Sequence, residues 1–435
     1  MVRDGTVVPR RRHHAHVNPV VIVASCESYR TGDFIAAARA QRLPVVIATD
    51  AASPFDDIAD RSLTINLDDA RAGAAAIVAA VPDAAGVIAI DDQGVAVAGA
   101  SAALLGLPTN PAVAIEATRN KLAMRELLLA DGVKQPDFVA VADGHLHEAV
   151  LAIGTPVVVK PVSLAASRGV IRVDDPATAA TTESRIRSIL RDAHHPHGEP
   201  LIAERYIDGE EMVVEGLMVD GQLEVLALID KPVPLVGPFF EETMFVSPSG
   251  HSKETTDRVI ERVAEAVEAI GLVTGPVHAE VRISEDGDVY IIEVAARSIG
   301  GLCGRSLTFG LLGEPLESVI IRSALGRTAR LETAAQPATG VLMIPIPGAG
   351  RLTGIEGLDQ AEEIEGIDSL EITIPTGRDV VPLPEGDRYL GFVFASGMTP
   401  ADVRQSLAAA AALIDPIIDG EYVTSEGQHD AADAR

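Results

Sequence analysis

Several residue types are rare in this chain of 435 residues, and each shortage limits what the protein can be. There is no tryptophan and aromatic residues make up only 3%, so the hydrophobic cores must be built mainly from aliphatic side chains. The two cysteines, Cys26 and Cys303, lie far apart, which excludes a disulfide framework and is typical of a reducing cytosol. No apolar run reaches the roughly 18 residues that a membrane span needs. We therefore expect a cytoplasmic protein that does not enter a membrane.

Basic residues are also scarce. The formal net charge is −28, which repels nucleic acids and anionic lipid surfaces, so we expect neither as a partner. Lysine is the rarer of the two basic types, with five lysines among 35 basic residues. Because a chain that prefers arginine keeps lysine where a compact ammonium is required, each lysine is informative. Lys121 and Lys160 fall in the motifs described below.

Apolar runs of strand length alternate with alanine-rich runs of helix length, which predicts an α/β fold followed by an α+β unit. The first part predicts a small parallel sheet, but Ser25-Cys26-Glu27-Ser28 follows its first strand instead of the glycine fingerprint of dinucleotide-binding domains. The predicted strands are 20–24, 45–49, 63–66, 87–90, 138–141, 157–160, 340–346, 370–374 and 391–395, with two or three antiparallel strands between 201 and 230. The predicted helices are 31–42, 69–80, 118–131, 145–153, 176–191, 253–270, 315–325 and 399–414.

Two glutamates, Glu280 and Glu293, lie in alternating apolar runs on either side of Asp286-Gly287. An Asp-Gly pair between such runs predicts a hairpin with a type I′ turn. Centring the turn there pairs Val281 with Ile292 and Glu280 with Glu293. Opposed side chains have Cβ atoms about 4.5–5.5 Å apart, so both carboxylates should resist full ionisation. A divalent cation removes that conflict, and Mg²⁺ prefers carboxylate oxygens, so the pair predicts a metal site.

Four stretches follow one another in a fixed order: 118–121, 159–170, 203–211, and the carboxylate hairpin with Arg297 beyond it. At these intervals they resemble the ATP-grasp superfamily of carboxylate–amine ligases. The run Gly275–Glu280 paired with Glu293–Arg297, and the C-terminal stretches 350–352, 377–380 and 389–393, are similar to the L-amino acid ligases. Those enzymes join two amino acids into a dipeptide.

The resemblance implies a domain order. It places a Rossmann-like pre-ATP-grasp domain at 18–115 and an ATP-grasp domain at 116–332, whose small mobile lid covers about 138–208. A C-terminal α+β domain follows at 333–424, and the tails 1–17 and 425–435 are expected to be disordered. A homodimer is also what the resemblance suggests.

The implied reaction transfers the terminal phosphate of ATP to a substrate carboxylate, and an amine then attacks the acyl phosphate. The products are an amide, ADP and phosphate, and the expected cofactors are ATP and Mg²⁺, with Mn²⁺ as the alternative metal. Both steps build negative charge on phosphoryl or acyl oxygens, so fixed cations should carry the catalysis. Two other hypotheses stay open: a purine-pathway or biotin-carboxylase-like ATP-grasp enzyme, and a catalytically inactive nucleotide-binding sensor.

By position, the resemblance assigns the nucleotide contacts. Lys121 and Lys160 should contact the α- and β-phosphates, beneath a small-residue loop that contains Ser167 and Gly169. Family loops often carry more glycine than this one.

The adenosine contacts follow in the third stretch. Glu204 and Ile207 should bracket adenine mainly through backbone groups. Glu211 should hold the ribose hydroxyls, with Glu210 as the competing choice one residue away.

The remaining assignments concern the metal and the substrates. Glu280 and Glu293 should ligate the metal, and Ala295 stands where many relatives have an asparagine, which leaves a second metal with fewer ligands. Arg297 should stabilise the transferring phosphoryl group. The substrate candidates are Glu242, which could bind an α-ammonium, His278, Arg305, and Gly300 and Gly301, whose amides are expected near the carboxylate being activated. Cys303 is interpreted as a packed residue because this mechanism needs no thiol.

Overall fold

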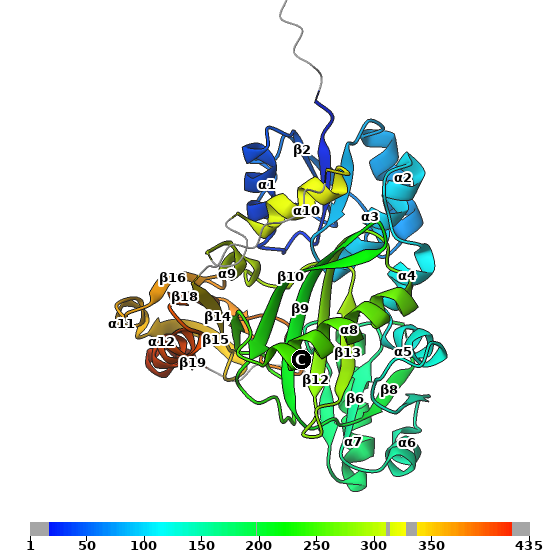
Figure 1. Cartoon of the computed structure of the whole chain (residues 1–435), viewed down its shortest axis with the longest axis vertical. Helices are drawn as coiled ribbons and strands as arrows, with labels where there is room; N and C mark the ends of the chain where they lie inside the picture. Colours follow the sequence, from blue (N-terminus) through cyan, green and yellow to red (C-terminus); the bar gives the residue numbers. More distant parts are fainter. Residues whose placement is uncertain (1–16, 197, 310–313, 328–336, 420–435) are drawn as a thin grey trace, which may run out of the picture.

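The computed structural model describes residues 17–196, 198–309, 314–327 and 337–419. The predicted tails lie outside these residues, apart from Val17. The boundary expected near 330–338 also lies outside them, apart from Pro337 and Ala338. Within the described part, no helix is both long and apolar enough to cross a membrane. Figure 1 shows an N-terminal unit at one end, a central sheet, and a small sheet with two helices at the other end.

The N-terminal unit is the predicted parallel sheet. Its strands are β1 (Val20–Val23), β2 (Val45–Thr49), β3 (Arg61–Thr64) and β4 (Gly86–Ala89), in the order β3-β2-β1-β4 with all pairs parallel. Every residue of β1 and β2 is buried, as expected for a parallel sheet covered on both faces. The helices are α1 (Thr31–Ala40), α2 (Ala70–Ala80), α3 (Asp92–Leu105) and α4 (Ala112–Ala117).

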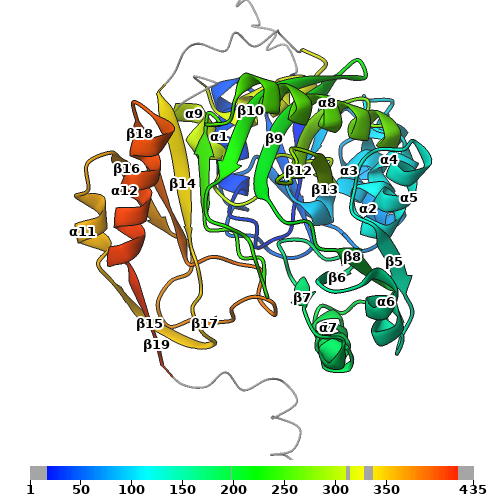
Figure 2. The same ribbon diagram turned by 60° about the horizontal axis from the view of Figure 1, so that its bottom comes forward.

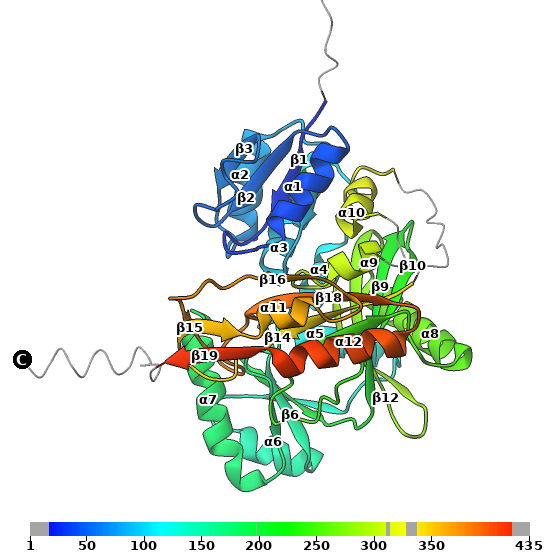
Figure 3. The ribbon, with the colours of Figure 1, turned by 90° about the vertical axis from the view of Figure 1, so that its left-hand side faces the viewer.

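A much later helix, α10 (Leu316–Ala324), also belongs to this end of the molecule. It packs on α1 and β4, and Figures 1 and 3 both place it beside the N-terminal sheet. Leu316, Val319 and Ile320 share one hydrophobic core with Phe34 and Ile35 of α1. The N-terminal unit is therefore held to the rest of the chain by a segment almost 300 positions away in the sequence.

The central sheet has eight strands in the order β13-β12-β9-β10-β11-β14-β18-β16, and all of its pairs are antiparallel. It contains β9 (Glu210–Val219), β10 (Gln222–Lys231), β11 (Met244–Ser247), β12 (Gly275–Ile283), β13 (Val289–Ala295), β14 (Ala338–Ile344), β16 (Ile367–Ile372) and β18 (Gly391–Gly397). The short strand β11, which the sequence pattern did not reveal, pairs with both β10 and β14. It therefore joins the C-terminal strands to the central sheet, and the predicted domain boundaries stay a prediction.

Helices pack on this sheet, and residues next to their ends cap them. Helix α8 (Lys253–Ile270) begins after Ser252, whose side chain caps it, and ends at Gly271 with φ +85°. Helix α12 (Pro400–Leu413) begins with a capping box between Thr399 and Asp402. Helix α5 (Lys121–Ala130) starts three residues later than predicted because Asn120 caps it, accepting from the N–H groups of Leu122 and Ala123.

A second antiparallel sheet has the order β5-β8-β6-β7 and lies apart from the central one, as Figure 2 shows. Its strands are β5 (Phe138–Val141), β8 (Leu201–Arg205), β6 (Val157–Pro161) and β7 (Ile171–Val173), with α6 (Leu146–Ile153) and α7 (Ala179–Asp192) packed on one face. It falls within the range expected for the lid. The remaining elements are a 3-10 helix (Pro176–Thr178) directly before α7, α9 (Gly304–Phe309), α11 (Leu358–Glu362) and a three-stranded sheet of β17 (Asp379–Val380), β15 (Gly350–Glu356) and β19 (Asp415–Asp419).

Candidate active site

A cavity of about 390 Å³ lies where the N-terminal unit, the small sheet, the central sheet and the segment 387–389 meet. That volume is in the range of small-molecule sites. Most of the predicted site residues line it: Lys121, Lys160, Ser167, Glu204, Ile207, Glu211, Glu242, His278, Glu280, Glu293, Arg297, Gly300 and Gly301. Among the predicted residues, Gly169 and Arg305 are outside the lining, and so is the alternative Glu210.

The carboxylate hairpin places Glu280 opposite Glu293, as predicted, but its turn and strand register differ from the prediction. The turn is not type I′, because Gly287 has a positive φ of 79° and Asp286 does not. Its loop is one residue longer than expected, so Val281 faces Ile291 rather than Ile292. A β-bulge between Val281 and Glu280 then absorbs Ile292 and restores the predicted pairing of the two glutamates.

Glu280 does not resist ionisation in the way we expected. Burial alone would raise the pKa of Glu280, but Lys231 and His278 outweigh it and hold that pKa well below its usual range. Lys231 Nζ lies 3.4 Å from Glu280, and His278 Nε2 lies 3.1 Å from it. Glu293 lies 3.6 Å from Lys121 Nζ. For Glu280 the expectation was wrong because Lys231 and His278 compensate its charge.

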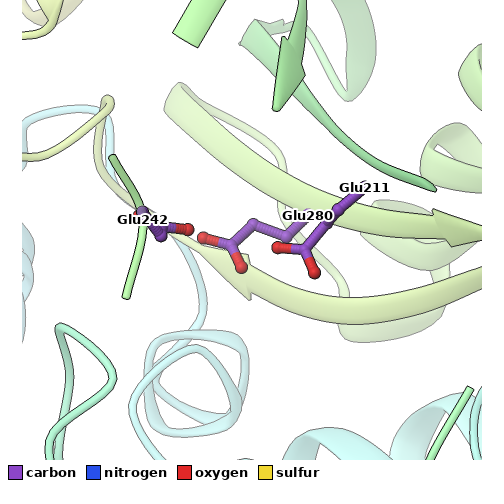
Figure 4. Close-up of side chains that lie close together, drawn as sticks. All are labelled: Glu211, Glu242 and Glu280. Atoms are coloured by element: carbon purple, nitrogen blue, oxygen red, sulfur yellow. The ribbon is translucent and has the colours of Figure 1, made fainter. Parts of the chain in front are cut away.

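Lys231 lies among three carboxylates, from Glu211 on β9, Glu280 on β12 and Glu242 in the segment before β11. Figure 4 shows these three side chains pointing toward one another, and their oxygens lie within 4.8 Å. Lys231 Nζ is 2.6 Å from Glu211 and in still closer contact with Glu242. Burial raises the pKa of Glu242 to about 7, even though Lys231 acts against that rise.

Glu211 and Glu210 have different surroundings, which decides between them as lining residues. Glu211 is buried and also accepts from Arg282 Nε at 2.8 Å. Glu210 is exposed and is paired with His251. Neighbouring strand residues point to opposite faces, so only one of the two reaches the cavity.

The small sheet contributes a buried ion-pair cluster around Glu204. Lys160 Nζ lies 2.7 Å from Glu204, and Arg125 Nε donates to the same carboxylate at 2.7 Å. Burial would raise the pKa of Glu204, but the two cations lower it to about 2. Lys121 Nζ donates to the carbonyl of Leu164 at 2.7 Å, which ties α5 to the loop after β6.

The loop between β6 and β7 carries backbone strain. Ala166 and Ser167 have positive φ angles of 54° and 55°, which non-glycine residues rarely adopt and which cluster at functional sites. Gly169 is also at positive φ, but contrary to expectation it does not line the cavity. Its N–H donates to the carbonyl of Pro384 at 2.9 Å. Arg168 Nε donates to the carbonyl of Glu385, so the C-terminal segment holds this loop.

At the other end of the cavity, Arg297 lies beside the glycines Gly300 and Gly301. Its Nε donates to Asp92 at 2.8 Å, and this partner holds the pKa of Arg297 above its usual value although burial opposes the rise. Arg305 is instead bound to Asp33 at 2.8 and 2.9 Å and to Glu371. Because both partners lie outside the cavity lining, the structure does not bring Arg305 to the substrate end.

Several residues of the site escaped the sequence analysis. Lys231 could have been found, because it is one of only five lysines and follows an apolar run. The two lysines that are not part of the site, Lys134 and Lys253, form exposed ion pairs. Arg125 and Asp92 carry no motif, so only the fold reveals them.

Comparison with known proteins agrees with this geometry. Residues 153–306 match a family model described as an ATP-grasp domain, and residues 342–419 match one described as L-amino acid ligase C-terminal domain 2. The chain carries an ATP-grasp domain and an L-amino acid ligase C-terminal domain. Both the predicted family and the predicted fold class are confirmed.

Individual relatives give the extent of the likeness. The alanine–anticapsin ligase of Bacillus subtilis (strain 168) is 32% identical over 213 residues, which cover 45% of this chain and 44% of that protein. The chain thus matches less than half the length of this relative. The crystal structure of L-amino acid ligase from Bacillus licheniformis has a TM-score of 0.80 at 25% identity, covering 93% and 99% of the two chains. A biotin carboxylase domain from Hydrogenobacter thermophilus, in complex with MgADP and bicarbonate, has a TM-score of 0.67 at 14% identity, covering 91% and 90%, and shares the fold alone.

Proposed function

We propose that the protein is an ATP- and Mg²⁺-dependent ligase that joins an amino acid carboxylate to a second amine and releases ADP and phosphate. The observation that carries the proposal is the single cavity that gathers the lysines, the two opposed glutamates, Arg297 and the Gly300-Gly301 loop. Its ends differ in chemistry, which suits a reaction between a nucleotide and a small acid.

The nucleotide would occupy the end near the small sheet. A cluster of Val158, Val170, Leu235 and Phe240, with Tyr206 packed against it, supplies an apolar surface for adenine. Glu211 lies next to this surface and would hold the ribose hydroxyls. Lys121 and Lys160 would meet the phosphates. In this structure both have carboxylate partners, so they would exchange those contacts when ATP binds.

Glu280 and Glu293 fit a divalent cation. Their carboxylates are the hard oxygen ligands that Mg²⁺ prefers, and the low pKa of Glu280 keeps it in the charged form that binds metal. The bound metal, Mg²⁺ or alternatively Mn²⁺, would supply charge neutralisation on the phosphates.

The chain's own residues would then act on the substrates. A carboxylate oxygen attacks the terminal phosphorus and ADP leaves, while Arg297 neutralises charge on the transferring group. The amine nitrogen next attacks the acyl carbon, phosphate leaves, and the nitrogen loses a proton. We further propose a homodimer, as the resemblance suggests, and a cytoplasmic enzyme, as the two distant cysteines suggest. Light scattering and cell fractionation would test these two proposals.

The test is a phosphate-release screen over amino acid pairs with ATP and Mg²⁺, with mass spectrometry of the products. We expect ADP, phosphate and an amide whose mass is the sum of two amino acids less one water. Glu293→Gln should lower turnover at least ~10²-fold because it removes a charged metal ligand. Glu285→Gln, in the exposed turn of the same hairpin, is the matched control. Release of AMP and pyrophosphate would refute the acyl-phosphate mechanism.

A further inference from the structure

Arg30 is a buried cation that the proposed chemistry has not used. It follows the loop after β1, is only 4% exposed, and lines the cavity. Its Nη1 donates to the carbonyl of Ile90 at 2.8 Å and its Nη2 to Ser298 Oγ at 2.8 Å. A guanidinium has five N–H donors, so these two bonds leave three without an acceptor among the described residues.

Arg30 differs from the other arginines and lysines that line the cavity. Each of the others has a carboxylate within ion-pair distance: Lys121 with Glu293, Lys160 with Glu204, Arg205 with Asp137, Arg282 with Glu211, Arg297 with Asp92, and Arg388 with Glu27. Arg30 has no such partner in the described part of the chain. Burial accordingly lowers its pKa. A buried, unpaired charge is costly unless a ligand compensates it.

The loop beside Arg30 offers further donors. The N–H groups of Gly300 and Gly301 have no hydrogen-bond acceptor among the described residues, and both glycines line the cavity. A Cβ on Gly300 would meet nothing within 4 Å, so the backbone there is open to a ligand. Ser298 Oγ accepts from Arg30, which leaves its own O–H free to donate.

We infer that Arg30, Ser298 and the amides of Gly300 and Gly301 form a binding site for a substrate carboxylate that is not activated, that of the amine substrate. This inference rests on the proposed ligase function. The activated carboxylate must meet the metal and Arg297, and it loses its charge in the amide product. A carboxylate that persists through the reaction keeps its charge, and therefore suits a fixed guanidinium and amide donors. Arg30 would thus select amino acids over simple amines.

The test compares two acceptors, the best amino acid from the phosphate-release screen and its carboxamide, in the wild type and in Arg30→Gln. We expect the wild type to prefer the free acid by ~10²-fold or more in kcat/KM, because a site built for a charged group rejects the neutral analogue. Arg30→Gln should lower kcat/KM for the free acid ~10²-fold and leave that for the carboxamide within about threefold. Arg30→Lys should recover part of the loss, since lysine keeps the charge but not the fork.

Arg61→Gln is the matched control, because Arg61 is an exposed arginine of the same N-terminal unit that also donates to a backbone carbonyl. It should leave both kcat/KM values unchanged. An equal loss for both acceptors in Arg30→Gln would overturn the inference and reduce Arg30 to a tie between β4 and the Ser298 loop. If the wild type turns over but Arg30→Gln keeps its full preference for the acid, only this inference fails. If no amino acid releases phosphate or raises the melting temperature of the wild type with ATP and Mg²⁺, the proposed function fails with it.

Discussion

Replacing Lys231 by methionine should destabilise the protein by an amount that depends on pH. Lys231 is 2% exposed in its side chain and is the shared partner of Glu211, Glu242 and Glu280. Without it, Glu211 keeps Arg282 at 2.8 Å and Glu280 keeps His278 at 3.1 Å. Glu242 keeps no cation within ion-pair distance among the described residues.

The cost is therefore that of one uncompensated carboxylate rather than three. Leaving one buried charge without its partner costs about 3–5 kcal/mol of unfolding free energy. The pKa of Glu242 is already raised to about 7, so between its unfolded value of 4.5 and 7 the folded state binds more protons than the unfolded state. Its contribution to stability accordingly falls as pH rises through that window. Losing Lys231 raises this pKa further, and one pH unit above 7 is worth about 1.4 kcal/mol for a single group. The penalty of the variant should therefore be about 1.4 kcal/mol larger at pH 8 than at pH 6, and it should approach ~3–5 kcal/mol only at higher pH.

The assay is guanidinium unfolding at both pH values, followed by far-ultraviolet circular dichroism because the chain has no tryptophan. Lys253→Met is the matched control, since Lys253 is 85% exposed in its side chain and paired with Asp257 on the surface of α8. That variant should lose less than about 1 kcal/mol. The reasoning is refuted if Lys231→Met is as stable as the control, or if its loss of stability is the same at pH 6 and pH 8.

Three further predictions follow from the ion pairs. His278→Asn should remove up to ~3 kcal/mol of stability at pH 6 and progressively less toward pH 9. The partners of His278 raise its pKa from 6.5 to about 9 against the effect of burial, and the stabilisation is lost as pH rises between those values. Denaturation at both pH values checks this, and an equal loss at both would contradict it. Arg185→Gln removes two bonds from α7 to Glu385, at 2.6 and 2.9 Å. Glu385 belongs to the segment that holds the loop between β6 and β7, so the variant should raise the KM for ATP severalfold while costing less than about 1 kcal/mol. Steady-state kinetics tests this, and an unchanged KM would contradict a role of this contact in positioning the loop. Arg125→Met should cost about 1–3 kcal/mol, because it removes the donor to the carbonyls of Ile291 and Ile292 while Lys160 still compensates Glu204. A loss below about 1 kcal/mol in guanidinium unfolding would argue against it.

The sequence predicted those parts of the fold that depend on local chemistry. Helix α8 was predicted to the residue because Ser252 and Gly271 mark its ends. Strands β1 and β2 were predicted because they are continuous apolar runs, whereas β3, which has the sequence Arg61-Ser62-Leu63-Thr64, begins two residues before the predicted 63–66. Strand β11 was missed because four residues between two prolines carry no periodic signal, although its pairing joins two parts of the central sheet.

The candidate site divides in the same way. Residues that carry a motif, such as Lys160 and Glu293, were predicted to lie together, and the structure brings both to the cavity. Arg305 was misplaced because nearness in sequence to Gly301 does not fix the direction of a side chain on α9. Lys231 was overlooked although its rarity was the same signal that identified Lys160. Arg30 could not be found, because its significance is that no carboxylate among the described residues lies within ion-pair distance of it in the fold.

The predicted pairing of Glu280 with Glu293 depends on two departures from an ideal hairpin that cancel. The longer turn alone would have placed Glu293 opposite Ala279, and a shift of one residue moves a side chain to the other face of the sheet. The bulge at Ile292 reverses that shift and returns Glu293 to the face of Glu280. Arg125 stabilises the bulge, because its guanidinium donates to the carbonyls of Ile291 at 3.2 Å and Ile292 at 2.8 Å. The geometry of the proposed metal pair is thus set by a residue 166 positions away from Ile291, which is why spacing along the hairpin gave the right pair through a wrong register.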